Sequence, residues 1–135
     1  MRNSIFIGLL IVFLLVISAC NSEDPKVFDE NKNDWLNIKL KDVSTGDEFS
    51  ISDFKDKPIL VESFAVWCPV CFKQQQEIKK LHDKVGDKVI SVSIDTDPNE
   101  DEERVREHIT KNGFNWRFAV SPTEFTQSLI DEFGT

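Results

Sequence analysis

The most informative segment of this 135-residue chain is Ile59-Leu60-Val61-Glu62-Ser63-Phe64-Ala65-Val66-Trp67-Cys68-Pro69-Val70-Cys71. It starts with an apolar run of the length of a buried strand, which the charged Glu62 interrupts. From Pro69 the apolar residues recur at helical intervals as far as Gly86, a residue type that commonly follows the end of a helix. The pattern therefore predicts a core strand over 59–65 and a helix over 69–85, with two cysteines at their junction.

The sequence on either side of this segment predicts further strands and helices. We expect, in order, a hairpin of two strands over 35–43 and 48–51, a strand over 88–94, a charged helix over 100–111, a short strand over 118–120 and a last helix over 124–133. In the first of the helices, Val70 and Ile78 fall on the apolar face and Gln75 on the polar face. Strands that alternate with helices indicate an α/β fold with a parallel central sheet.

Cys68 and Cys71 lie three residues apart in the predicted first turn of a helix. At this spacing they share one face and are close enough to form a disulfide with little backbone movement. Cys68 falls where free backbone N–H groups and the helix dipole stabilise a thiolate, and Pro69 fits because this position needs no N–H. A lowered thiol pKa is the condition for attack on a disulfide. The sequence thus predicts thiol–disulfide exchange, with Trp67 and Pro69 in contact with the substrate and Trp67 offering an apolar surface to a partner chain.

The structural alternative for the two cysteines is half of a zinc site. Zinc would need two further ligands, and the only histidines are His82 and His108. His82 lies about three turns from Cys71 on the same predicted helix. His108 lies on the charged helix, whose apolar stripe we assign to Val105 and Ile109. We therefore expect both histidines at the surface or its boundary, and no metal site.

The first 34 residues are expected to lie outside the folded domain. Arg2 precedes an apolar run over 5–17 and a small-residue exit, which is the pattern of a secretory signal. The run is shorter than the ~20 residues of a transmembrane helix, although an uncleaved anchor remains an alternative. The exit sequence Ile17-Ser18-Ala19-Cys20 resembles the lipobox of prokaryotic lipoproteins, with a plain secretory signal as the alternative.

The lipobox resemblance implies that the chain has three parts. These are a signal peptide over 1–19, a lipidated Cys20 with a flexible tether over 20–34, and a folded domain over 35–135. The acyl chains would hold the domain at the extracytoplasmic face of a prokaryotic cell membrane.

Charge and cysteine content restrict the function further. The chain carries 24 acidic and 16 basic residues, a net charge of −8, so no nucleic-acid partner is expected. With Cys20 assigned to the lipid, Cys68 and Cys71 are the only remaining thiols. A single close pair is not the disulfide framework of a small secreted fold, so the pair must serve a local purpose.

The segment 59–71 resembles the strand and active site of thioredoxins, and the chain from about 36 to 135 resembles the TlpA/ResA-like membrane-tethered thiol-disulfide oxidoreductases, which overlap the redoxin (AhpC/TSA-like) group. This resemblance implies a thioredoxin-like fold with an N-terminal β-hairpin and a helix–strand insertion over about 96–118. It implies that Cys68 is the attacking thiol, that Cys71 is the more buried resolving thiol, and that no cofactor is bound. The implied partners are exported cysteine-containing proteins and a membrane thiol electron donor.

Glu62 lies six residues before Cys68, where thioredoxins place a buried acid that moves a proton to and from the resolving cysteine. A carboxyl group inside a parallel sheet should have a raised pKa because it is desolvated, which suits acid–base work near neutrality. Ser91 stands where thioredoxins have a lysine, so we expect no ammonium group beside Glu62. The alternative is that Glu62 points to a solvated edge.

The sequence departs from the family pattern in two ways. No histidine stands between the cysteines, so we expect a moderately reducing centre. The sequence ends at Gly134–Thr135, before the place of the family's cis-proline strand and final hairpin, so we expect a C-terminally incomplete domain. Two other functions stay open: a peroxiredoxin-like peroxidase and a non-enzymatic lipoprotein that binds a metal or a partner.

Overall fold

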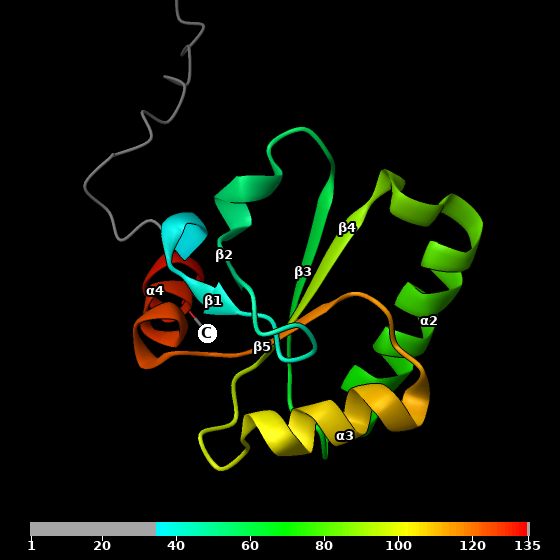
Figure 1. Cartoon of the computed structure of the whole chain (residues 1–135). Coiled ribbons are helices and arrows are strands. Elements are labelled where there is room, and N and C mark those ends of the chain that lie inside the picture. The colour runs from blue at the N-terminus through cyan, green and yellow to red at the C-terminus, as the bar shows by residue number, and fades with distance from the viewer. Residues whose placement is uncertain (1–34, 135) are drawn as a thin grey trace, which may run out of the picture. The chain divides into compact units, whose positions relative to one another are not determined.

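The centre of the fold is a three-stranded parallel sheet, seen in a computed structural model that describes residues 35–134 (Figure 1). Its strands are β3 (Ile59–Phe64), β4 (Ile90–Asp95) and β5 (Arg117–Val120), in the order β3–β4–β5. The register places Glu62 of β3 opposite Ser93 of β4. The predicted α/β fold with a parallel centre is therefore confirmed.

Three helices follow the strands in the predicted order. They are α2 (Pro69–Val85), α3 (Glu102–Asn112) and α4 (Thr123–Phe133). The N-cap of α2 is Cys68, and the helix ends at Gly86, whose φ of 59° is strained for any side chain other than glycine. A short 3₁₀ turn, η3 (Gly86–Lys88), leads from α2 into β4. The first helix thus begins at the cysteine pair, as the sequence predicts.

The N-terminal hairpin is shorter than the sequence predicts. Its elements are η1 (Trp35–Asn37), β1 (Leu40–Lys41), β2 (Glu48–Phe49) and η2 (Ile51–Phe54). β1 and β2 pair antiparallel, but the predicted strand over 35–39 is wrong, since this segment starts with a 3₁₀ turn. The Trp35 ring packs edge-to-face on Phe125 of α4, with ring centroids 6.1 Å apart. This contact turns the segment toward α4, and of the alternating apolar residues only Leu40 is fully buried.

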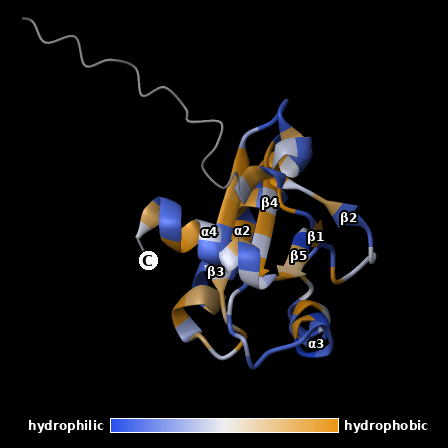
Figure 2. Ribbon diagram, turned by 90° about the vertical axis from the view of Figure 1, so that its left-hand side faces the viewer, coloured by the Kyte–Doolittle hydropathy of each residue, from blue (hydrophilic) through white to orange (hydrophobic). Residues whose placement is uncertain are grey.

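Two hydrophobic clusters pack on opposite faces of the sheet. One joins the sheet to α2 and α3 and includes Phe64, Ile78 and Phe118. The other joins it to the hairpin and α4 and includes Val92 and Phe125. Successive strand residues alternate between the faces, and each fully buried large apolar side chain contributes about 1.5–3 kcal/mol. Figure 1 accordingly shows α2 and α4 on opposite sides of the strands, and Figure 2 shows hydrophobic residues along β3 and β4.

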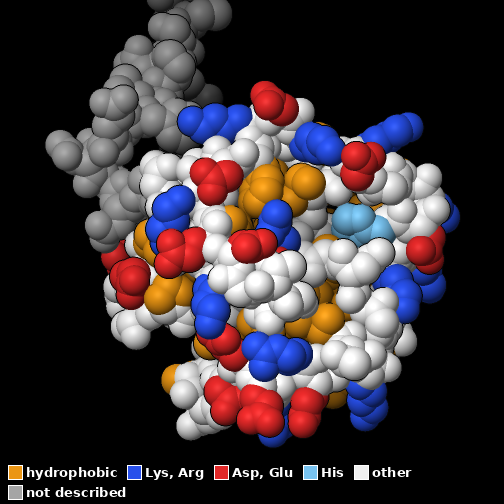
Figure 3. All heavy atoms as spheres, viewed as in Figure 1, with side chains coloured by type: hydrophobic (Ala, Val, Ile, Leu, Met, Phe, Trp, Pro, Cys, Tyr) orange, Lys and Arg blue, Asp and Glu red, His pale blue; other side chains and the backbone are white. Residues whose placement is uncertain are grey.

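Charged side chains of both signs are interspersed over the face drawn in Figure 3, with hydrophobic side chains visible between them. One ion pair at the surface joins Lys41 of β1 to Glu102 of α3, with Nζ and Oε2 3.0 Å apart. Exposed pairs of this kind add about 1 kcal/mol or less to stability. The two hydrophobic clusters therefore carry most of the stability of the fold.

The predicted signal peptide, Cys20 and the tether lie outside the described residues, so these predictions stay as they stand. Within residues 35–134, no helix has both the length and the apolar content needed to cross a membrane.

Candidate active site

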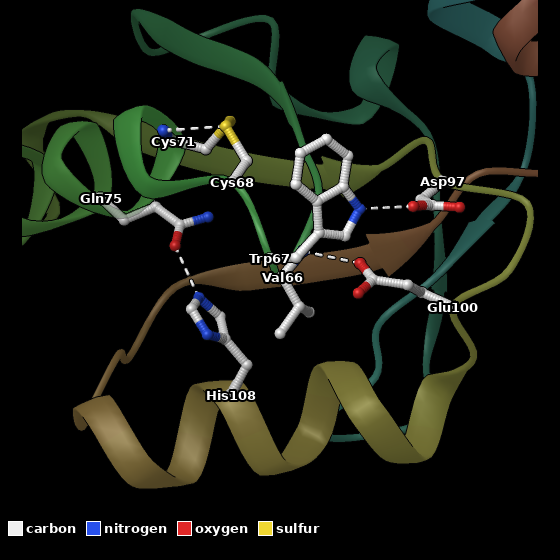
Figure 4. The surroundings of a disulfide bond; sticks show 8 residues. All are labelled: Val66, Trp67, Cys68, Cys71, Gln75, Asp97, Glu100 and His108. Carbon is white, nitrogen blue, oxygen red and sulfur yellow. Dashed lines mark hydrogen bonds between the residues drawn. A yellow bond between two sulfur atoms is a disulfide. The ribbon is translucent and has the colours of Figure 1, made fainter.

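Cys68 and Cys71 form a disulfide at the N-terminus of α2 (Figure 4). Their Cα atoms are 5.3 Å apart. Cys68 is the N-cap residue, its Sγ atom accepts a hydrogen bond from the backbone N–H of Cys71 at 3.2 Å, and Pro69 occupies the first helical position. Free N–H groups and the positive end of the helix dipole therefore point at Cys68, and both stabilise a thiolate when the disulfide is reduced.

The two sulfur atoms face different surroundings. Cys68 lines a surface pocket of about 610 Å³, together with Trp67 and Pro69. Cys71 does not line this pocket and packs instead against the hydrophobic cluster between the sheet, α2 and α3. Of the two cysteines, Cys68 is therefore the one that a partner can approach through the pocket.

Apolar side chains beside the disulfide are open to solvent. Trp67 is 66% exposed and Val70 is 72% exposed. The Trp67 indole Nε1 donates a hydrogen bond to Asp97 Oδ2 at 2.6 Å, and this bond is the largest cause that lowers the pKa of Asp97. The exposed position of Trp67 agrees with the prediction of an apolar surface for a partner chain.

The buried face of α2 differs from the one that the sequence predicts. Val70 is exposed, whereas Gln75 is fully buried although it was predicted on the polar face. The inward stripe runs through Cys71, Gln75 and Ile78, at the i, i+4 and i+7 spacing of one helix face. Val70 is one residue off this stripe, at the start of the helix, so its side chain turns to solvent.

Glu62 is buried, with 6% of its surface exposed. Desolvation raises its pKa, while the Ser93 hydroxyl and, more weakly, the Gln75 amide act in the opposite direction. Ser93 Oγ donates to Glu62 Oε1 at 2.5 Å and accepts from the Trp116 indole Nε1 at 2.8 Å. The predicted burial and raised pKa are confirmed, and the alternative of a solvated edge is wrong. Ser93 and Trp116 were not identified from the sequence, because the contact of Ser93 with Glu62 depends on the strand register and Trp116 reaches Glu62 only through Ser93.

His108 lies inside the fold, so the prediction of a surface or boundary position is wrong. It is 9% exposed and its ring stacks on Phe64 with centroids 5.9 Å apart. The Nε2 atom is 2.7 Å from Oε1 of Gln75, and desolvation lowers the pKa of the imidazole. The sequence contained a signal for this burial: His108 falls between Val105 and Ile109 on the predicted apolar stripe of α3.

His82 keeps the boundary position that the sequence predicts. Its Nε2 atom is 2.9 Å from Ser91 Oγ, and its ring stacks on Trp116. Among residues 35–134, no group of three or more His, Cys, Asp or Glu side chains is arranged to hold a metal ion.

The loop after β4 forms hydrogen bonds with Val66 and Trp67, the two residues that precede Cys68. Glu100 Oε2 accepts from the backbone N–H of Val66 at 2.6 Å, and its Oε1 accepts from Arg104 Nε at 2.7 Å. Asp95, buried beside Glu100, has its pKa raised to about 6, mainly by desolvation and further by the charge of Glu100, against the backbone N–H of Asp97. The active-site turn is thus fixed by Glu100, a member of a buried pair of carboxyl groups that the sequence did not reveal.

Comparisons with known proteins find a similar sequence and similar folds. The Bacillus subtilis thioredoxin-like protein YneN is 31% identical to this chain, over 72% of the chain and 63% of YneN, so the chain spans less than two thirds of that relative. The thioredoxin domain of a Bacteroides vulgatus thiol-disulfide oxidoreductase matches with a TM-score of 0.62 at 21% identity, over 73% of this chain and 69% of that one. A secreted Mycobacterium tuberculosis disulfide oxidoreductase matches with a TM-score of 0.55 at 20% identity, over 64% and 61%.

The two solved structures share the fold, and the predicted thioredoxin-like architecture is confirmed. The family model Redoxin matches residues 30–134, which include every strand and helix described above and the bonded cysteine pair. The chain belongs to the redoxin family.

Proposed function

We propose that this protein is a thiol–disulfide oxidoreductase that exchanges its Cys68–Cys71 disulfide with cysteines of partner proteins. One observation carries the proposal: the cysteines are bonded across the first turn of α2, with Cys68 on an open pocket and Cys71 against the core. Trp67 and Val70 add exposed apolar surface on which a partner chain can rest.

The geometry supports a two-step exchange. In the reducing direction, the Cys68 thiolate attacks a disulfide of the partner, forms a mixed disulfide and releases one partner sulfur as a thiolate. Cys71 then loses its proton, and its thiolate attacks Cys68 Sγ, which restores the Cys68–Cys71 disulfide and releases the second partner thiolate. The protein gives up two electrons and the partner takes them up.

Glu62 is our candidate for the group that takes the proton of Cys71. It is a buried carboxyl group with a raised pKa, which suits proton transfer near neutrality. Gln75 connects the two residues, because it lies one turn after Cys71 on the inward stripe of α2 and its amide acts on the pKa of Glu62.

The cellular setting is part of the proposal. The lipobox-like sequence at Cys20 supports a lipid anchor at the extracytoplasmic face of a prokaryotic membrane, as in the TlpA/ResA-like group. The partners would then be exported proteins with cysteines, and a membrane thiol donor would reduce the protein again. Labelling cells with an alkyne fatty acid tests the anchor: the parent chain should take up label, and Cys20→Ser should not.

Trapping of the mixed disulfide tests the exchange chemistry. Cys71→Ser should accumulate a covalent complex with a disulfide-containing protein, whereas the matched Cys68→Ser should form none. A parent protein that leaves protein disulfides unreduced would contradict the proposal. Consumption of peroxide that survives Cys71→Ser would favour the peroxidase alternative.

A further inference from the structure

We infer that Gln75 and His108 form a positioning pair, in which His108 holds the Gln75 amide so that its N–H group faces Cys71 and Glu62 during the second step of exchange. This inference rests on the proposed thiol–disulfide exchange and extends it to two residues that do not touch the partner. Three features of the described residues carry it: the hydrogen bonds of His108, the buried amide nitrogen of Gln75, and the place of Gln75 on α2.

The hydrogen bonds of His108 fix the orientation of the Gln75 amide. Asn112 Nδ2, which can only donate, lies 3.3 Å from His108 Nδ1, so Nδ1 is the acceptor nitrogen of the neutral ring. The ring proton is therefore on Nε2 and is donated to Gln75 Oε1 at 2.7 Å. Figure 4 shows the amide oxygen of Gln75 turned toward His108 and the amide nitrogen turned away from it.

The amide nitrogen of Gln75 is a buried donor without a well-formed hydrogen bond in the disulfide form. Gln75 is fully buried, and its Nε2 atom has no partner of good hydrogen-bond geometry among the described residues, although it is near enough to Glu62 to lower the pKa of that carboxyl group. Buried donors are usually paired, and a donor to an anion forms the stronger bond. Reduction and the loss of the Cys71 proton supply such an anion, because they turn a disulfide sulfur into a thiolate, which accepts hydrogen bonds.

The place of Gln75 selects Cys71 as this partner, with Glu62 as the neighbouring acid. Gln75 follows Cys71 by one turn on the inward stripe of α2, so the side chains lie on the same helix face. The same amide acts on Glu62, whose pKa it lowers. A donor between the two groups stabilises whichever of them is the anion while the proton passes from Cys71 to Glu62.

The surroundings of the pair include few other charges. The titratable groups around the Gln75 amide are Glu62 on β3, Cys71 on α2 and His108 on α3. Glu100 and Lys111 act on His108 from the loop before α3 and from α3 itself, with opposite signs. The ring of His108 is also held by contacts with Phe64, Phe72 and Phe114, so it can keep the amide in one orientation.

The test separates the two steps of exchange in the full chain, with Cys20→Ser in every variant. Reduced protein is mixed with dithiobis(nitrobenzoate), and the release of thionitrobenzoate is followed by its absorbance. The first equivalent reports attack by Cys68 and the second reports attack by Cys71. In Gln75→Met, which keeps the length of the side chain without the amide, we expect the first phase to stay within about 2-fold and the second to slow about 10-fold, as for a lost hydrogen bond to an anion.

A second variant and a matched control complete the experiment. His108→Phe keeps an aromatic ring in the cluster but frees the amide, and we expect its second phase to slow several-fold, with the midpoint of its pH profile shifted upward. Gln74→Met is the control, because Gln74 precedes Gln75 on α2 but is exposed. The control should match the parent in both phases.

The outcomes distinguish this inference from the proposed function. If the parent shows no second phase, the proposed exchange fails. If the parent shows both phases and the second is unchanged in both Gln75→Met and His108→Phe, only the positioning pair is overturned. Equal slowing in the Gln74→Met control would show an effect of the substitution on α2 as a whole and would also overturn the pair.

Discussion

The two cysteines of one disulfide lie in contrasting regions of the molecule. The outer region, formed by Cys68, Trp67 and Val70, is open to solvent and borders the surface pocket. The inner region consists of Cys71, Gln75 and Glu62. Cys71 packs against the hydrophobic cluster between the sheet, α2 and α3, and Gln75 and Glu62 are buried polar side chains. Four residues of one helical turn therefore span the distance from water to the core.

This contrast shows how the two sulfur atoms of one disulfide can have different chemical environments. In the outer region, backbone N–H groups and the helix dipole stabilise the anion, and side chains only provide contact surface. In the inner region, Glu62 and Gln75 are buried, so the transfer of a proton depends on the position of these individual groups. Substitutions in the inner region should therefore change the chemistry, and those in the outer region should change the choice of partner.

Removal of the carboxyl group of the inner region should give the largest effect. In Glu62→Gln we expect the attack by Cys71 to slow about 100-fold near neutral pH, since a positioned base typically contributes ~10²–10⁴-fold. Ser93 can still donate to the amide oxygen of glutamine, so the fold should be kept. The second phase of thionitrobenzoate release measures this rate, while the first phase should stay unchanged.

The same variant should be more stable than the parent, which separates catalysis from folding. The pKa of Glu62 is raised in the folded state, so its ionisation costs stability as the pH rises through that pKa. In urea unfolding, the free energy of unfolding of Glu62→Gln should be higher than that of the parent at pH 8 and equal to it near pH 4. A slower second phase together with reduced stability at pH 8 would mean that Glu62 has a structural role instead.

The fold was largely predictable because its strongest signals are local. The run over 59–65 and the helix that ends at Gly86 each have a clear period and boundary, and both are confirmed. The segment that starts at Trp35 was not predictable in this way, because its conformation depends on a contact with Phe125, far along the chain. Alternation of apolar residues cannot show which distant side chain they meet.

The two sulfurs and the acid of the candidate site were predictable, but the polar groups around them were not. The spacing of Cys68 and Cys71 and the resemblance to thioredoxins identified both cysteines and Glu62 from the sequence. Ser93 requires the register of β3 on β4, and Gln75 requires the rotation of α2 about its axis. The periodicity of apolar residues does not identify buried polar residues such as Gln75, since a glutamine in the sequence looks the same whether its amide is buried or solvated.

The buried carboxyl pair of Asp95 and Glu100, beside the active-site turn, should affect how stability depends on pH. Asp95 titrates at about 6 in the folded state, above its ordinary value of 3.8, so stability should fall as the pH rises between about 4 and 6. A shift of this size corresponds to about 2–3 kcal/mol. In Asp95→Asn this fall should be smaller, because the amide carries no charge beside Glu100 and its oxygen can still accept from Asp97, while the contribution of Glu62 stays.

Urea unfolding of the oxidised proteins from pH 4 to 8 measures this effect. Asp56→Asn is the matched control, because Asp56 is exposed on the loop before β3. The control should follow the parent across the whole range. The same change in stability between pH 4 and 6 in Asp95→Asn and in the parent would show that the Asp95–Glu100 pair does not affect the pH dependence of stability.

The smallest expected effect belongs to Val70, in the outer region. Since Val70 is 72% exposed, Val70→Ser should change the free energy of unfolding by no more than about 0.5 kcal/mol. Partial burial of its side chain under a partner would still add to binding, so exchange with a protein disulfide such as that of insulin should fall about 3-fold. Exchange with oxidised glutathione, which is too small to cover Val70, should stay at the parent rate. The control is Lys84→Ser at the far end of α2, in which both reactions should stay at the parent rate. An equal loss with both disulfides would mean that Val70 acts on the sulfurs themselves, and the division between a region for chemistry and a region for partner contact would not hold.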